Sequence, residues 1–117
     1  MSQNTVSLTR PFVVRGACVT ASATLTNGTN TTLLTGDSAY KLDLVEISIS
    51  NTSTVAVPVT LKDDGTTVRN FNIPLSGTVQ ANYSIPLPQS AAGGIWSVDT
   101  ADDTNTTINV EAIFIKN

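Results

Sequence analysis

The residue types that perform most enzyme chemistry are scarce in this chain of 117 residues. It has no histidine and one cysteine, Cys18, so histidine-based triads and most zinc sites cannot be built. Cys18 falls on the polar side of an alternating segment and has no sequence neighbour that would activate a thiolate, so we expect an inert side chain. The composition therefore predicts that the protein is not an enzyme.

Acidic residues are the remaining candidates for chemistry. Asp99, Asp102 and Asp103 lie close together, and Asp63 and Asp64 are adjacent. Carboxylates in such groups can act as acid and base, or can bind calcium. Both segments also have the composition of polar turns, and neither has the spacing of an EF-hand loop. We expect no catalytic residue, metal or cofactor; a structural calcium ion and a small metal-dependent enzyme are the alternatives.

Two aromatic residues are candidates for a ligand contact. Trp96 follows a Gly93-Gly94 pair, and it could stack on a sugar ring in a concave site that also uses Tyr83. Burial statistics favour the other interpretation, in which the tryptophan lies in the core or in a subunit contact. The two interpretations predict opposite exposures of the indole ring.

Charges are few and scattered along the chain. Six basic and nine acidic residues make up 13% of the sequence and give a net charge of −3, against a usual charged fraction of about 25%. The basic residues do not cluster, so we expect no nucleic-acid partner. The sequence also lacks the long apolar run of a membrane helix and the start of a signal peptide, so we expect no membrane partner.

The elements that position these residues follow from a two-residue alternation of apolar and polar side chains, which is typical of half-buried strands. The Asp-Gly pair in Asp63–Thr66 predicts a tight hairpin. No segment has a helical apolar stripe. Seven or eight short strands predict an all-β fold, a single antiparallel, jelly-roll-like β-sandwich over residues 17–117. The alternating segments are residues 17–26, 55–62, 71–75, 79–87 and 108–116.

Two strands carry an irregularity. The alternation slips between Leu44 and Val45, which predicts a β-bulge or a bend. Pro58 cannot donate to a ladder, which predicts an edge strand or a bulge at that residue.

Both ends of the chain contain candidate contact residues. The last strand ends apolar on both sides, at Ile113, Phe114 and Ile115, so one side should meet the core and the other a second surface. Residues 1–16 precede the alternation and are either a frayed terminus or an extended N-terminal arm that pairs with a neighbouring subunit. The apolar residues that would anchor such an arm are Leu8, Phe12, Val13 and Val14.

Several motifs follow one another over about residues 36–117. They are Ile47-Ser-Ile-Ser-Asn51, Lys62-Asp-Asp-Gly65, Ile73-Pro-Leu75, Ile85-Pro-Leu-Pro88, Gly93-Gly-Ile-Trp-Ser-Val98 and Val110-Glu-Ala-Ile-Phe-Ile115. Their order resembles small β-sandwich structural proteins of tailed-bacteriophage virions, especially capsid decoration (cement) proteins. The resemblance implies a homotrimer on the outer capsid, at a junction between capsomers, with no catalytic residues. Related modules occur in phage head fibres and tail appendages.

We therefore expect a non-enzymatic virion protein, made in the bacterial host cytoplasm, that binds the major capsid protein and stabilises the outer head surface as a trimer. The expected subunit or capsid contacts are Leu8, Phe12, Val13, Ile113, Phe114 and Ile115. The alternative is a receptor- or glycan-binding module of a head fibre, tail appendage or adhesin, with Trp96 and Tyr83 as ligand contacts.

Overall fold

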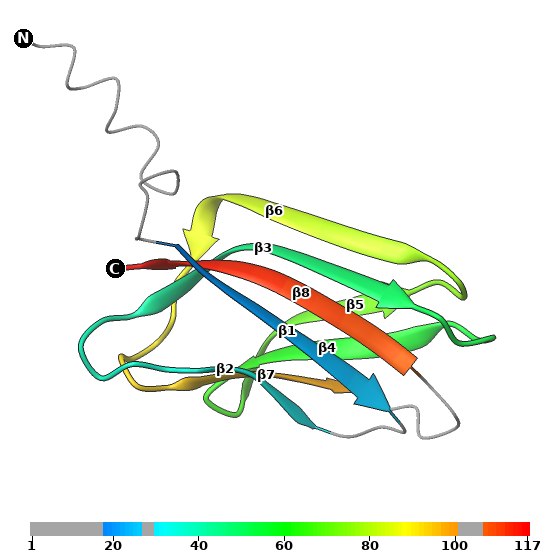
Figure 1. The fold of residues 1–117 in the computed structure, drawn as a ribbon, viewed down its shortest axis with the longest axis horizontal. Coiled ribbons are helices and arrows are strands. Elements are labelled where there is room, and N and C mark those ends of the chain that lie inside the picture. Colours follow the sequence, from blue (N-terminus) through cyan, green and yellow to red (C-terminus); the bar gives the residue numbers. More distant parts are fainter. Residues whose placement is uncertain (1–17, 27–29, 101–106) are drawn as a thin grey trace, which may run out of the picture.

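The chain forms two packed antiparallel sheets (Figure 1). The computed structural model describes residues 18–26, 30–100 and 107–117. One sheet has the strand order β1-β8-β3-β6 and the other β2-β7-β4-β5, which confirms the predicted antiparallel sandwich. Within the described residues, no helix is long and apolar enough to cross a membrane. The strands are β1 (Cys18–Thr26), β2 (Thr31–Thr35), β3 (Leu42–Asn51), β4 (Val57–Asp63), β5 (Thr66–Ile73), β6 (Thr78–Leu87), β7 (Ile95–Thr100) and β8 (Thr107–Lys116).

The connections between strands are those of a jelly roll. Successive strands lie in different sheets except for β4 and β5, so the chain crosses between the layers at every connection but that one. Strands that are distant in sequence consequently pair, as β1 and β8 do from Cys18 opposite Ile115 to Thr26 opposite Thr107. Eight strands wrapped in this way make the double-sheet jelly roll, and the predicted fold class is confirmed.

The β4–β5 hairpin turns at the predicted Asp-Gly pair. Asp63 pairs with Thr66, which leaves Asp64 and Gly65 as a two-residue turn. Their φ angles are 50° and 88°. Positive φ at both central positions is the requirement of a type I′ hairpin turn, whose twist matches that of the strands, and glycine and aspartate are among the residues that tolerate it.

The predicted irregularity in β3 is a β-bulge. The register of β3 shifts between Leu44 and Glu46 against both β6 and β8, so Val45 is skipped in both ladders.

The prediction for Pro58 is wrong, because β4 lies between β7 and β5 rather than at an edge. Pro58 pairs with Asn72 of β5, and the register shift in that ladder falls between Leu61 and Lys62 rather than at the proline.

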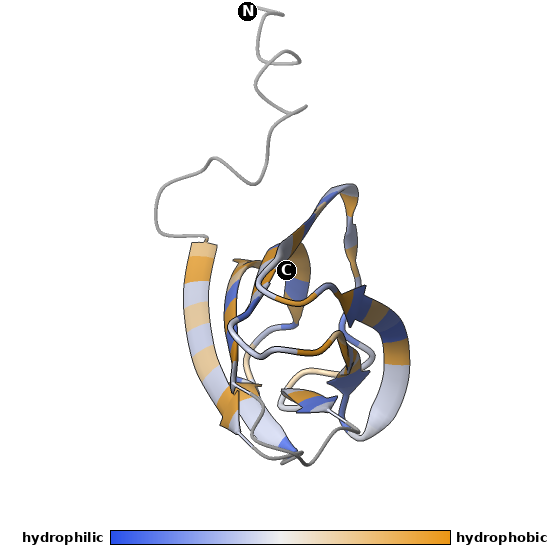
Figure 2. Ribbon diagram, turned by 90° about the vertical axis from the view of Figure 1, so that its right-hand side faces the viewer, coloured by the Kyte–Doolittle hydropathy of each residue, from blue (hydrophilic) through white to orange (hydrophobic). Residues whose placement is uncertain are grey.

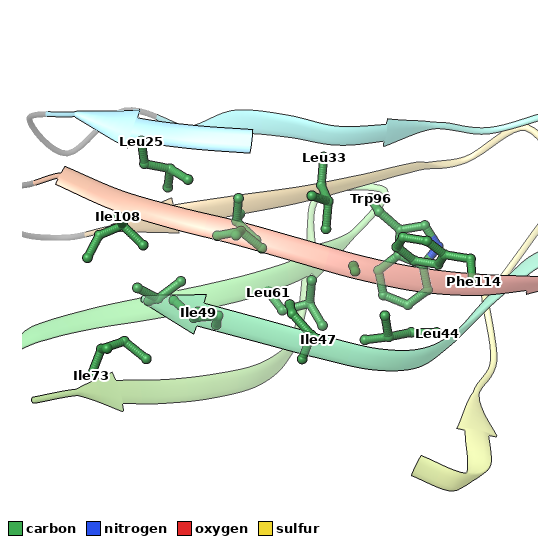
Figure 3. Close-up of a cluster of buried hydrophobic side chains, with 14 of the residues drawn as sticks. Leu25, Leu33, Leu44, Ile47, Ile49, Leu61, Ile73, Trp96, Ile108 and Phe114 are labelled. Carbon is green, nitrogen blue, oxygen red and sulfur yellow. The ribbon is translucent and has the colours of Figure 1, made fainter. Parts of the chain in front are cut away.

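The core fills the space between the two sheets. Side chains at alternate positions of facing strands meet there (Figure 3), and the same alternation appears as bands of hydropathy along β1 in Figure 2. Trp96 of β7 and Phe114 of β8 bring their ring centroids to 5.5 Å at a tilt of 44°, so this aromatic pair joins the sheets. Labelled members of the core are Leu25, Leu33, Leu44, Ile47, Ile49, Leu61, Ile73, Trp96, Ile108 and Phe114.

Two predictions about exposed residues are corrected by this core. Trp96 has an exposed fraction of 0%, and its indole N–H donates to the Leu42 carbonyl at 2.8 Å. The prediction of Trp96 as a ligand contact is therefore wrong, because its whole ring is used in packing. Phe114 is also fully buried, so it is not a surface contact; in β8 its side of the alternation faces the core, while Ile113 and Ile115 lie on the other side.

Candidate functional site

The outer face of the β1-β8-β3-β6 sheet is polar over most of its length. Neutral side chains bond one another across the strands: the Thr24 hydroxyl donates to Asn109 Oδ1 at 3.0 Å, and the Ser50 and Thr78 hydroxyls are 3.1 Å apart. Such cross-strand pairs stabilise a sheet modestly without ion pairs. This face therefore presents mainly hydroxyl and amide groups to the solvent.

The same face becomes apolar at the end where β8 finishes. Ile113 and Ile115 lie there beside Val45 at the β3 bulge and Ile85 near the end of β6. We name these four residues the apolar strip. Ile85 has an exposed fraction of 84%, whereas Ile115 is buried but stands apart from the core cluster. Val45 and Ile113 line one hollow and Ile85 and Ile115 line another at the same end of the sheet. Apolar side chains gathered in this way, unlike a single exposed one, mark a candidate interaction site.

The bulge of β3 creates this arrangement. Leu44 pairs with Leu87 and Glu46 pairs with Asn82, so residues 83–86 of β6 stand opposite Val45 alone. The end of β6 consequently bends sharply (Figure 1). The alternation of β6 predicts Ile85 on the inward side; the bend instead carries it into solvent, and no local signal other than the nearby prolines indicates this change.

Two surface hollows flank the apolar strip, at the end of the sandwich where β1 begins and β8 ends. The first has a volume of about 620 Å³ and the second about 450 Å³. Each has room for a few side chains of a partner or for a small ligand. The first is lined by residues that include Cys18, Val45, Glu46, Asn82, Tyr83 and Ile113, and the second by residues that include Ile85, Pro86, Pro88, Ile115 and Asn117.

Tyr83 lines the first hollow, and it is the predicted ligand contact that the structure leaves at the surface. Its ring packs partly against the core, and the Arg69 guanidinium carbon lies 5.9 Å from the ring centroid, a cation–π distance. The structure thus brings Tyr83 next to Ile113 and separates both from the buried Trp96. The predicted arm contacts Leu8, Phe12 and Val13 lie outside the described residues.

Two of the acidic candidates that the structure describes, Asp63 and Asp99, have structural contacts. Asp99 Oδ2 forms a salt bridge with Lys62 Nζ at a distance of 3.2 Å. Asp63 Oδ2 accepts the Ser90 N–H at 2.7 Å, and its buried Oδ1 has no hydrogen-bond partner among the described residues. In the part of the chain that the structure describes, no three His, Cys, Asp or Glu side chains group closely enough to hold a metal ion. Asp102 and Asp103 lie outside that part.

Comparison with known proteins shows a shared fold. No protein-family model and no curated protein sequence matches the chain. A chain in the acidic stable capsid structure of Helicobacter pylori bacteriophage KHP30 is 12% identical over 87% of this chain and 90% of that one, with a TM-score of 0.63. A chain in the cyanophage Pam1 capsid asymmetric unit is 9% identical over 84% of each chain, with a TM-score of 0.56.

The fold also occurs outside capsids. The carbohydrate-binding module CBM36, solved in complex with calcium and xylotriose, is 13% identical over 80% of this chain and 78% of that one, with a TM-score of 0.54. At such identities the likeness shows the fold alone. A function for this chain must therefore be argued from its own surface.

Proposed function

We propose that the protein is a non-enzymatic structural protein of a tailed-phage virion. In this proposal a homotrimer binds the outer surface of the head, contacts the major capsid protein and stabilises the shell. The observation that carries the proposal is the apolar strip at one end of a sheet face that is otherwise polar and has few charges. The fold that the chain shares with chains of two phage capsids supports a place in a virion.

A protein of this kind acts through binding free energy alone. By bridging neighbouring shell subunits it makes their separation cost more. Full burial of an isoleucine side chain contributes about 2 kcal/mol, and Ile85 is exposed and available for such a contact. A trimer presents the contact three times and gains avidity where the geometry allows all three to engage together. Because the contact is apolar, it should depend little on salt.

Removing the exposed apolar group should weaken attachment without unfolding the sandwich. Ile85→Ser is expected to reduce the affinity for particles that lack the protein by about 30-fold per contact, because about 2 kcal/mol of burial is lost. Cosedimentation with such particles measures this. Leu75→Ser is the matched control, since Leu75 is also an exposed apolar residue but lies in the β5–β6 connection. Equal binding by the two variants would count against the strip.

The predicted arm contacts are tested by deletion. Removal of residues 1–12 takes away Leu8 and Phe12 and ends before the first described strand at Cys18. We expect lower occupancy on particles and an unchanged far-ultraviolet circular dichroism spectrum. Full occupancy by the shortened chain would reject a role of the arm in attachment.

The first hollow favours a second candidate function, a receptor- or glycan-binding module. Tyr83 offers an aromatic face there, and Asn82 and Glu46 offer groups that hydrogen-bond sugar hydroxyls. A glycan array tests this function, with Tyr83→Ala as the variant because Trp96 belongs to the core. A glycan bound by the natural chain and lost in Tyr83→Ala would establish the module; an array without any bound glycan would leave the virion proposal standing.

A further inference from the structure

The chain enters the sandwich beside the apolar strip. Cys18, the first described residue, lines the first hollow and pairs with Ile115. Figure 1 shows the start of β1, the end of β6 and the C-terminus together at this end. Seventeen residues precede Cys18. An extended chain spans about 3.5 Å per residue, so Val13 can lie up to about 17 Å from Cys18, which itself lines the first hollow.

The chemistry of these seventeen residues complements the surface next to them. They include the apolar group Phe12, Val13 and Val14, the basic residues Arg10 and Arg15, and no acidic residue. Apolar side chains of this size suit the strip, and the arginines supply positive charge that can pair with carboxylates of the adjacent face.

The adjacent sheet face carries negative charge. Glu46 and Glu111 both line a shallow depression next to the first hollow, and neither forms a salt bridge with a lysine or arginine of the described residues. Lys116 lines the second hollow, but its ammonium lies 5.0 Å from the centroid of the Tyr40 ring. Arg15, three residues before Cys18, can therefore reach an unpaired glutamate, Glu46, at the hollow that Cys18 itself lines.

We propose that the N-terminal arm folds back over its own sheet and docks on the apolar strip. Phe12 and Val13 lie over Val45 and Ile113, in the hollow that Cys18 lines, Arg15 lies beside Glu46, and Ile85 stays exposed at the edge of the covered area. A short tether gives the arm an effective concentration in the millimolar range, which favours its own strip over that of another copy. This inference does not rest on the virion function; the docked arm and the strip would form one surface.

Crosslinking in the full chain tests the docking. With Cys18→Ser removing the native thiol, Val13→Cys and Ile85→Cys are introduced together and treated with a short flexible bis-maleimide in dilute solution. We expect an internally linked monomer, recognised by its faster migration in a denaturing gel and its mass. The control pairs Val13→Cys with Thr67→Cys, because Thr67 is exposed on β5 of the opposite sheet.

The outcomes separate the alternatives. An internal product at least several-fold more abundant with Ile85→Cys than with Thr67→Cys supports docking. Linked dimers or larger species would show arms exchanged between copies and would overturn docking within one chain, while equal yields at both sites would overturn a preferred site altogether. All of these results are independent of particle binding.

The charge pairing has its own test in the same crosslinking background. Arg15→Glu is expected to lower the internal yield about threefold, in line with an exposed ion pair, and adding Glu46→Arg should restore it. An unaffected yield in Arg15→Glu would overturn the pairing of Arg15 with Glu46.

Discussion

Trp96→Ala is expected to lower the free energy of unfolding by about 3–5 kcal/mol, the usual cost of removing a large buried aromatic side chain. Trp96 is fully buried, it packs on Phe114 across the two sheets, and its indole N–H satisfies the Leu42 carbonyl. The substitution leaves a cavity at the junction of the sheets and an unpaired carbonyl. Urea denaturation followed by far-ultraviolet circular dichroism measures the change without depending on tryptophan fluorescence.

Trp96→Phe separates the two parts of this effect. Phenylalanine keeps most of the packing against Phe114 but cannot donate to the Leu42 carbonyl, so we expect a smaller loss of about 1–3 kcal/mol. A Trp96→Ala variant within about 0.5 kcal/mol of the natural chain would behave like a surface substitution. That result would move the indole ring out of the core and reopen its role as a ligand contact.

Gln89→Leu should lower the free energy of unfolding by about 2–6 kcal/mol, since two buried backbone groups each lose a partner at about 1–3 kcal/mol. Gln89 has an exposed fraction of 1%. Its Oε1 accepts the Leu42 N–H at 2.8 Å, and its Nε2–H donates to the Gly94 carbonyl at 2.9 Å. The side chain thus joins the loop before β7 to the start of β3, at the end of the sandwich that holds the apolar strip.

Gln80→Leu is the matched control for Gln89→Leu. Gln80 lies exposed on the outer face of β6, where the same chemical change should alter stability by no more than about 0.5 kcal/mol. Chemical denaturation of the two variants side by side gives the comparison. Similar losses in both would mean that the buried amide of Gln89 has no special part in holding this end together.

The features that the sequence predicts correctly are local ones. The slip in alternation at Leu44 and Val45 marks the β3 bulge, because side chains of a strand change face every residue. The Asp64-Gly65 turn is predicted for a similar reason, since few residues tolerate positive φ. The outward position of Ile113 also follows from alternation along one strand, once Phe114 is placed in the core.

The features that the sequence does not predict have two causes, short strands and contacts between distant strands. β2 and β7 are too short, at 5 and 6 residues, to show a clear alternation. Ile85 becomes exposed because of the register between β3 and β6, which lie about 40 residues apart, and no local pattern contains that register. Trp96 likewise owes its burial to a facing strand, β8, at the end of the chain.

Imaging of phage particles tests the central claim most directly. Under the proposed function a phage encodes the chain, so purified protein is added to particles of that phage prepared without it, and the bound density is located by cryo-electron microscopy. The proposed function predicts saturable, threefold-repeated density on the outer head surface, which Ile85→Ser diminishes and Leu75→Ser does not. Bare heads at saturating protein, with the chain remaining in solution as a monomer, would contradict it.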